Sequence, residues 1–172
     1  MSLEKTLQGF KEVADNQALL QEEGMIAASK LNLHGLKRLH RHQADKCHYH
    51  GLCIANYAQD YGMNIAIPAV KGGFASTSLK DHLTKFIPKL EQDLEKLRKL
   101  NSEYCEVQGI MYEEGVHMQK CLSKKLMKMK FRWLPRFEFT KWDPTDIMIW
   151  DKWLHDKIRC IEEKHHHHDG QK

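Results

Sequence analysis

Residues 62–77, GMNIAIPAVKGGFAST, separate two longer stretches of the chain that differ from them in composition. They hold three glycines and one proline among β-branched residues, a composition typical of a loop. Loops of this length are uncommon inside a compact domain, where they usually form a crossover or a functional excursion. The stretch therefore predicts a long connection between two helical halves.

The half before this loop is predicted to be helical. Residues 2–62 are rich in Leu, Ala, Gln, Glu and Lys and contain no proline, which allows one very long helix or two helices joined by a tight turn. Asn32 and Gly35 relax the helical preference. We therefore expect helices over about 3–30 and 35–61.

The half after the loop, residues 79–130, returns to helical spacing of its apolar residues. Ser78 lies three residues before Asp81 and is predicted to cap the helix that follows. Asn101 and Ser102 form the one candidate turn, although neither glycine nor proline enforces it. A single continuous helix over the whole half remains the alternative.

The last part of the chain carries four tryptophans between Trp133 and Trp153. Asp143 and Pro144 predict the start of a short amphipathic helix over residues 147–161. The aromatic surface is expected to dock either on the chain's own bundle or on another subunit.

These elements predict an all-α fold, a four-helix bundle with a long crossover between its second and third helices and a short fifth helix. Length and composition fit one globular domain, with 172 residues, 41% hydrophobic and 29% charged. We expect the bundle over residues 1–131 with its crossover at about 62–78. A Trp-rich connection and helix would follow over 132–163, and an unstructured His-rich tail over 164–172.

Composition also limits the environment and the partners. No apolar run approaches the roughly 20 residues of a membrane span, and from the first residues we expect no secretory signal. Five cysteines, an odd number, argue against a disulfide framework and favour a reducing, cytoplasmic location. Mixed charges with a net +4 argue against nucleic acid. The basic run from Lys124 to Arg132 is either a charged helix end or a contact with an anionic surface such as a membrane.

Two short motifs place a carboxylate three residues before a histidine, on the second and on the fourth predicted helix. Such pairs share a helix face, and di-metal carboxylate bundles combine two of them with single carboxylates from the other two helices. A carboxylate stands level with each pair if the turns fall where predicted. Solvated surface residues are the alternative, because the chain has 23 acidic residues and 12 histidines. The predicted metal ligands are Glu12, Asp45, His48, Glu91, Glu114 and His117.

Several stretches resemble the ferritin family. Residues 35–48, GLKRLHRHQADKCH, resemble the part of ferritin helix B that ends in Glu-x-x-His. Residues 90–91 resemble the Leu-Glu of helix C, and residues 112–116, YEEGV, look like the start of helix D. Residues 149–154, IWDKWL, are similar to the aromatic-Asp-Lys motif of the short fifth helix. In this order the pieces cover most of residues 10–155.

The resemblance implies an oligomeric iron-storage subunit, assembled through helical faces and the Trp-rich segment, that would oxidise Fe(II) at a di-iron site if that site is intact. Three departures from the family's pattern resemble storage-type or degenerate subunits. Asp45 is one methylene shorter than the family's glutamate, Leu19 stands near the position of a tyrosine, and Gly115 near that of a glutamine. The ferroxidase ligands carried over are Glu12, Asp45, His48 and Glu91, with Glu114 and His117 as further candidates.

A second, non-enzymatic function also fits the pattern. If residues 2–62 and 79–130 form two long antiparallel helices, the chain resembles a scaffold or membrane-curvature module of the BAR kind. The basic run from Lys124 to Arg132 would then face lipid or a partner. The two hypotheses differ in whether turns divide each helical half.

Overall fold

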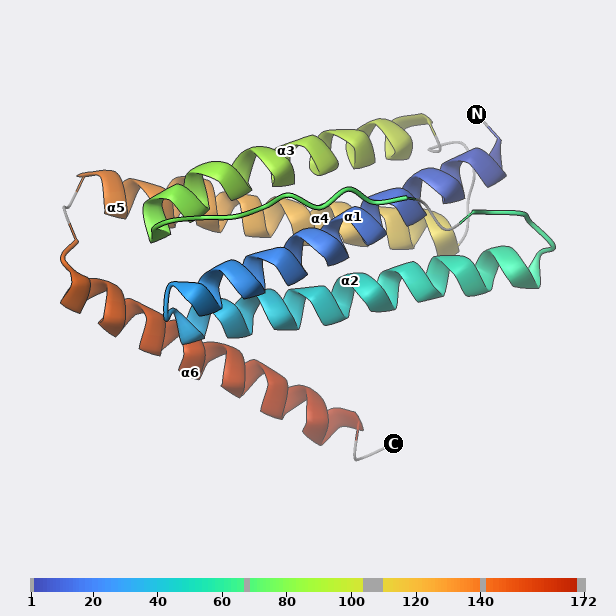
Figure 1. The fold of residues 1–172 in the computed structure, drawn as a ribbon. Helices are drawn as coiled ribbons and strands as arrows, with labels where there is room; N and C mark the ends of the chain where they lie inside the picture. The colour runs from blue at the N-terminus through green and yellow to red at the C-terminus, as the bar shows by residue number, and fades with distance from the viewer. Residues whose placement is uncertain (1, 67–68, 104–109, 140–141, 170–172) are drawn as a thin grey trace.

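In the computed structural model, which describes residues 2–66, 69–103, 110–139 and 142–169, all regular secondary structure within those ranges is helical (Figure 1). Four long helices form the bundle, and a further long helix lies against one of them. The all-α bundle predicted from sequence is therefore confirmed. In chain order the elements are α1 (Leu3–Lys30), α2 (His34–Asp60), α3 (Leu79–Glu103), α4 (Ile110–Met127), the π-helical segment η1 (Lys128–Trp133), α5 (Leu134–Phe139) and α6 (Pro144–Asp169).

The first half of the chain is divided by a tight turn at the predicted place. Asn32 has φ 58°, in the left-handed region that Asn tolerates better than most residues, and Leu33 N donates to Ala28 O at 3.0 Å. Two helices of 28 and 27 residues result. The two-long-helix scaffold required this half to be one helix, so that alternative is wrong.

The second half is also divided, but later than predicted. Asn101 and Ser102 lie inside α3, which ends at Glu103, and α4 begins at Ile110. Asn101 is buried, and its Nδ2 donates to Gly115 O of α4 at 3.0 Å. The side chain that suggested a turn thus holds two helices together.

The described parts of the crossover, residues 63–66 and 69–78, run along α1 without forming a helix over most of their length (Figure 1). Near the start of α1, the Gln8 amide donates to Ala66 O at 2.9 Å and accepts from Ala66 N at 2.7 Å. Near the end of α1, Glu23 Oε2 accepts from the backbone N–H groups of Gly73 and Phe74, both at 2.7 Å. Because the crossover spans the bundle from end to end, α3 runs parallel to α2.

Helix α3 starts with the predicted cap. Ser78 Oγ accepts from Asp81 N at 3.0 Å, and Asp81 Oδ2 accepts from Thr77 N at 2.9 Å. The first contact pairs a backbone N–H that the first helical turn leaves without a partner, and the second fixes the residue before the cap. The pKa of Asp81 is lowered, first by the hydrogen bond from Thr77 N.

Helix α4 continues without a break through η1 and α5, so the predicted boundary at residue 131 falls within a helical run. Trp133 of η1 meets Trp150 of α6 with ring centroids 5.2 Å apart, and both are buried. Phe137 of α5 lies 5.5 Å from Trp150. Helix α6 also lies against α2, and α5 contacts α3, so the aromatic segment docks on the chain's own bundle.

Helix α6 is longer than the short helix predicted. Asp143 Oδ1 accepts from Asp146 N at 2.9 Å, which confirms the predicted start, and the helix continues for 26 residues to Asp169. It takes in the run of histidines where an unstructured tail was expected. Residues 170–172 of that tail lie outside the described residues.

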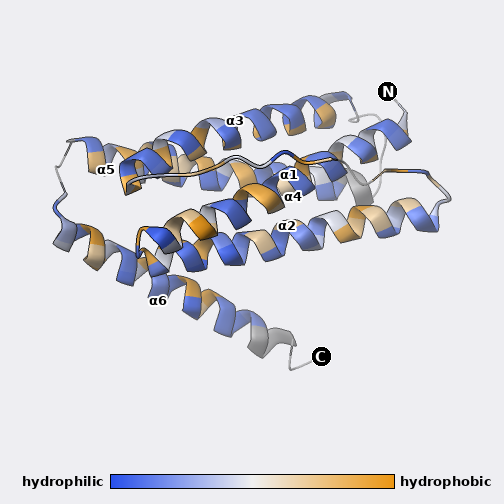
Figure 2. Ribbon diagram, in the orientation of Figure 1, coloured by the Kyte–Doolittle hydropathy of each residue, from blue (hydrophilic) through white to orange (hydrophobic). Residues whose placement is uncertain are grey.

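The core follows the apolar face of each helix (Figure 2). Leu7 and Phe10 of α1, Leu36 and Ile54 of α2, and Leu90 of α3 are fully buried. Within the described parts of the chain, no helix is both long enough and apolar enough to cross a membrane.

Candidate functional site

The predicted ligand pair on α2 does not face the bundle interior. The buried face of this helix runs through Cys47 and Ile54, whereas Asp45 and His48 are exposed. His48 Nε2 lies 2.7 Å from Glu22 Oε1 of α1, an ion pair on the surface when the imidazole is protonated. The carboxylate and the imidazole of this motif therefore do not point into the bundle.

The two single carboxylates of the predicted site, Glu12 and Glu91, also lie outside the bundle interior. Glu12 is exposed on α1. Glu91 of α3 accepts a hydrogen bond from Lys130 Nζ of η1 at 2.8 Å, and both side chains are substantially exposed. These carboxylates already have solvent or a cation as partner, and the structure does not bring them to the predicted pairs.

The bundle interior contains a different carboxylate. Asp93 of α3 is buried, and its Oδ2 accepts from Gln17 Nε2 of α1 at 2.7 Å. Burial raises the pKa of Asp93, and the hydrogen bond from Gln17 acts in the opposite direction. An amide thus occupies the place beside Asp93 where a second metal-binding carboxylate would be needed.

Glu114 and His117 of α4 are the two predicted ligands that the structure brings together, and His50 of α2 joins them. His50 Nδ1 donates a hydrogen bond to Glu114 Oε1, and the ring centroids of His50 and His117 are 5.5 Å apart. The hydrogen bond from His50 is the main reason why the pKa of Glu114 is lowered. One carboxylate and two imidazoles therefore gather where α2 faces α4.

This cluster is not a preformed metal cage. Across the described ranges, no three His, Cys, Asp or Glu side chains are already arranged to hold a metal ion. Cys121, one turn beyond His117 on α4, places its Sγ 3.6 Å from His117 Nε2. The side chains of this cluster therefore contact one another, His50 with Glu114 and His117 with Cys121, and leave no vacant position for an ion.

A chain of four polar side chains, of which Gln21, His40 and His82 are buried, crosses the other end of the bundle. Ser76 Oγ lies 3.0 Å from His82 Nδ1, His82 Nε2 lies 2.8 Å from His40 Nε2, and His40 Nδ1 lies 2.7 Å from Gln21 Oε1. One set of neutral tautomers satisfies all three contacts, with Ser76 donating to His82, His82 to His40, and His40 to Gln21. Burial lowers the pKa of His82 to about 4 and that of His40 well below its ordinary value.

An open groove of about 1420 Å³ lies between α1, α2, α4, η1 and α6, and His50 and His117 are among the residues that line it. The backbones of α2 and α4 approach each other in few places, and the groove lies open between them. The groove exposes the candidate cluster to solvent on one side.

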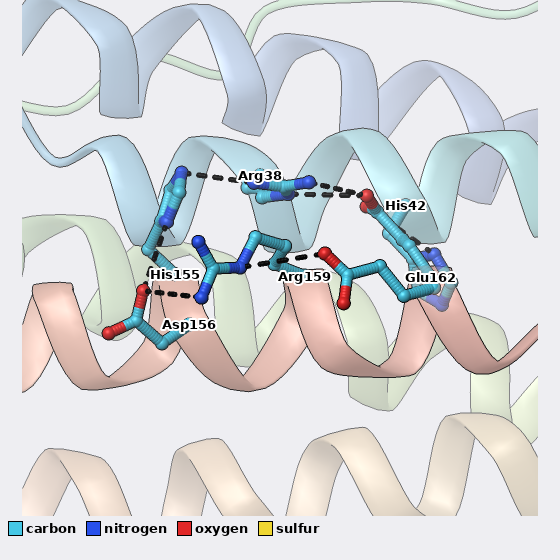
Figure 3. Close-up of polar contacts among 7 residues, drawn as sticks. Arg38, His42, His155, Asp156, Arg159 and Glu162 are labelled. Atoms are coloured by element: carbon cyan, nitrogen blue, oxygen red, sulfur yellow. Dashed lines mark hydrogen bonds and ion pairs between the residues drawn. The ribbon is translucent and has the colours of Figure 1, made fainter.

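Helix α6 borders the groove and is attached to α2 by polar contacts (Figure 3). Arg38 donates to Glu162 Oε2 from Nε at 3.2 Å and from a terminal nitrogen at 2.9 Å, and its other terminal nitrogen lies 3.1 Å from His155. Asp151 of α6 accepts from Gly35 N at 3.0 Å and from Leu36 N at 2.9 Å. The carboxylate of Asp151 therefore caps α2, which has no side-chain cap of its own.

Comparison with known proteins gives structural matches alone. No family model and no curated protein sequence matches this chain. A humanized archaeal ferritin matches with a TM-score of 0.74 and 11% identity, over 90% of this chain and 96% of its own. An open-pore ferritin from the hyperthermophilic archaeon Archaeoglobus fulgidus matches with a TM-score of 0.73 and 11% identity, over 90% of this chain and 98% of its own.

These matches cover 90% of this chain and nearly the whole of each ferritin chain. At 11% identity the matches establish the backbone arrangement only. Any function has to be argued from the side chains of this chain. The chain has the ferritin-like fold.

Proposed function

We propose that this chain is a ferritin-like subunit that takes up single divalent ions, with Fe(II) as cargo, at His50, Glu114 and His117. The proposal rests on the contact between Glu114 and His50 with His117 beside them. Two imidazoles and one carboxylate are a ligand set typical of non-haem Fe(II) sites that keep open coordination positions. Binding would replace the hydrogen bond between His50 and Glu114 and would turn His117 toward the ion.

We infer that the chain has no di-iron oxidase centre of the kind the sequence suggested. Glu12, His48 and Glu91 lie on the surface, and the last two have partners of their own. The interior carboxylate, Asp93, has an amide partner in Gln17. These contacts favour uptake of one ion over oxidation between two.

Variants of Glu114 test this proposal against the set predicted from sequence. Glu114→Gln keeps the size of the side chain and removes its charge, so we expect Co(II) and anaerobic Fe(II) to bind at least tenfold more weakly. Glu91→Gln removes a carboxylate from the surface and should leave affinity unchanged. Residues 165–168 are changed to glutamine in both variants and in the protein they are compared with, because the histidine run would bind metal itself. Equal losses in both variants, or none in either, would contradict the proposal.

We also propose that the subunit forms oligomers through its helical faces. Tyr49 and Leu52 of α2 are 66% and 61% exposed, and Met148 and Ile149 of α6 are 70% and 65% exposed. Exposed apolar groups that lie close together on a helix favour protein contacts. Sedimentation velocity is expected to show a concentration-dependent oligomer, and a monomer at every concentration would refute this part.

A further inference from the structure

Cys121 of α4 lies beside the side chains that are proposed to bind Fe(II). It follows His117 by one helical turn, and its Sγ lies 3.6 Å from His117 Nε2. Glu114, His117 and Cys121 are spaced three and four residues apart, so one face of α4 presents a carboxylate, an imidazole and a thiol together. His117 and Cys121 both line the open groove, which gives a dissolved ion access to them.

The separations in this cluster are those of ligands on one tetrahedral ion. With metal bonds of about 2.0–2.1 Å to nitrogen and about 2.3 Å to sulfur, a tetrahedral ion holds its nitrogen and sulfur ligands about 3.6 Å apart. The distance between His117 Nε2 and Cys121 Sγ matches that value. Two imidazoles on the same ion would have ring centroids roughly 5 Å apart, and those of His50 and His117 are 5.5 Å apart. The hydrogen bond between His50 and Glu114 has to open before all four groups can bind one ion.

A second thiol lies near the cluster but is a poorer ligand. Cys47 of α2 stands one turn before His50, lines the same groove and is buried. A metal needs the thiolate, and burial in apolar surroundings disfavours that charged form. Cys121 is partly exposed and already contacts an imidazole of the cluster. Of these two cysteines, Cys121 is therefore the one placed to bind an ion.

We propose that Cys121 is the fourth ligand of this site and that its thiolate makes the site select Zn(II) over Fe(II). The inference rests on the proposed function, because it uses the same His50, Glu114 and His117. Zn(II) favours four-coordinate sites of imidazole, thiolate and carboxylate, whereas two imidazoles and one carboxylate already suffice for an Fe(II) site with open positions. Mg(II) and Ca(II) take oxygen ligands and gain nothing from a thiol.

The fourth ligand has two consequences. The Cys121 thiol releases its proton to solvent when the ion binds, so the affinity for Zn(II) should rise with pH. With all four positions taken by protein side chains, a bound Zn(II) leaves no place for Fe(II). Zinc would therefore oppose the uptake of iron at this site.

The test compares the affinities of the full chain for Zn(II) and for Fe(II). Competition with a chromophoric chelator is measured without oxygen, and residues 165–168 are changed to glutamine in every protein compared. Cys121→Ser is expected to weaken Zn(II) binding by about tenfold or more and Fe(II) binding by less than about threefold. The control Cys160→Ser changes an exposed thiol of α6 that does not line the groove, and should leave both affinities unchanged.

Co(II) reports the ligand directly through its absorption spectrum. The unchanged chain and Cys160→Ser should both show a thiolate-to-cobalt charge-transfer band in the near ultraviolet, and Cys121→Ser should lose it. A band that survives in Cys121→Ser and disappears in Cys47→Ser would overturn the inference, because the thiol ligand would then be the other one.

The affinities separate this inference from the proposed function. If Glu114→Gln weakens the binding of both ions but Cys121→Ser weakens neither, or weakens both equally, the selection of zinc by Cys121 is overturned and the proposed site stands. If Glu114→Gln binds both ions as tightly as the unchanged chain, the proposed function fails and this inference fails with it.

Discussion

Replacing Gly35 with alanine is expected to destabilise the chain by about 3 kcal/mol and to loosen α6 from α2. A Cβ at this position would lie 2.0 Å from the backbone oxygen of Asp151 and 2.8 Å from His155 N. Both atoms belong to a helix backbone and cannot turn aside as the end of a side chain can. Helix α6 must therefore move away, and the burial of Trp150, Leu154 and Ile158 would be reduced.

Gly9→Ala is the matched control for Gly35→Ala. The new methyl would lie 2.7 Å from Leu100 Cδ2, the flexible end of a side chain that can change rotamer. Alanine is also favoured over glycine within a helix by up to about 1 kcal/mol, so stability should stay within about 1 kcal/mol of the original. Urea unfolding followed by tryptophan fluorescence measures both variants. Similar unfolding free energies would show that α6 does not pack on α2 as described.

The buried pair His40 and His82 is expected to make the fold sensitive to acid. The pKa of His82 falls from 6.5 in the unfolded chain to about 4 in the folded chain. Between these values the unfolded chain binds a proton that the folded chain does not, so stability falls as the pH is lowered. The shift corresponds to about 3 kcal/mol, present above pH 6.5 and lost by about pH 4.

The structural reason is the direction of the hydrogen bonds. With both rings neutral, His82 Nε2 donates to His40 Nε2 across 2.8 Å. A proton added to His40 would place two N–H donors against each other in a buried site. His82→Gln should flatten the dependence of unfolding free energy on pH between 6.5 and 4, whereas His48→Gln, a change at an exposed histidine, should not. Parallel pH profiles for these two variants would rule out the pair as the acid-sensitive element.

The fold could be predicted from sequence because its deciding signals are local. The composition of residues 62–77 indicated the crossover, Asn32 indicated the first turn, and Ser78 and Asp143 indicated caps. The second turn was misplaced because Asn101 is a polar residue held by a distant backbone carbonyl. Local preference carries no information about such a partner.

The candidate site was less predictable because the choice of helix face decides it. Asp45 and His48 have the correct spacing, but the buried face of α2 passes through Cys47. At about 100° per residue, His48 points a quarter-turn away from that face and Asp45 nearly opposite to it. His50 was missed since it belongs to no motif on its own helix, and its carboxylate partner, Glu114, comes from α4. Comparing the angular position of each motif residue with that of the apolar face of its helix would have placed Asp45 and His48 on the surface.

Anomalous diffraction from crystals soaked in Fe(II) without oxygen tests the central claim most directly. With residues 165–168 changed to glutamine, we predict one iron peak per chain, between His50, Glu114 and His117, and its loss when Glu114→Gln is added. A pair of peaks inside the bundle, or a peak bound by Glu12, His48 and Glu91, would contradict the account.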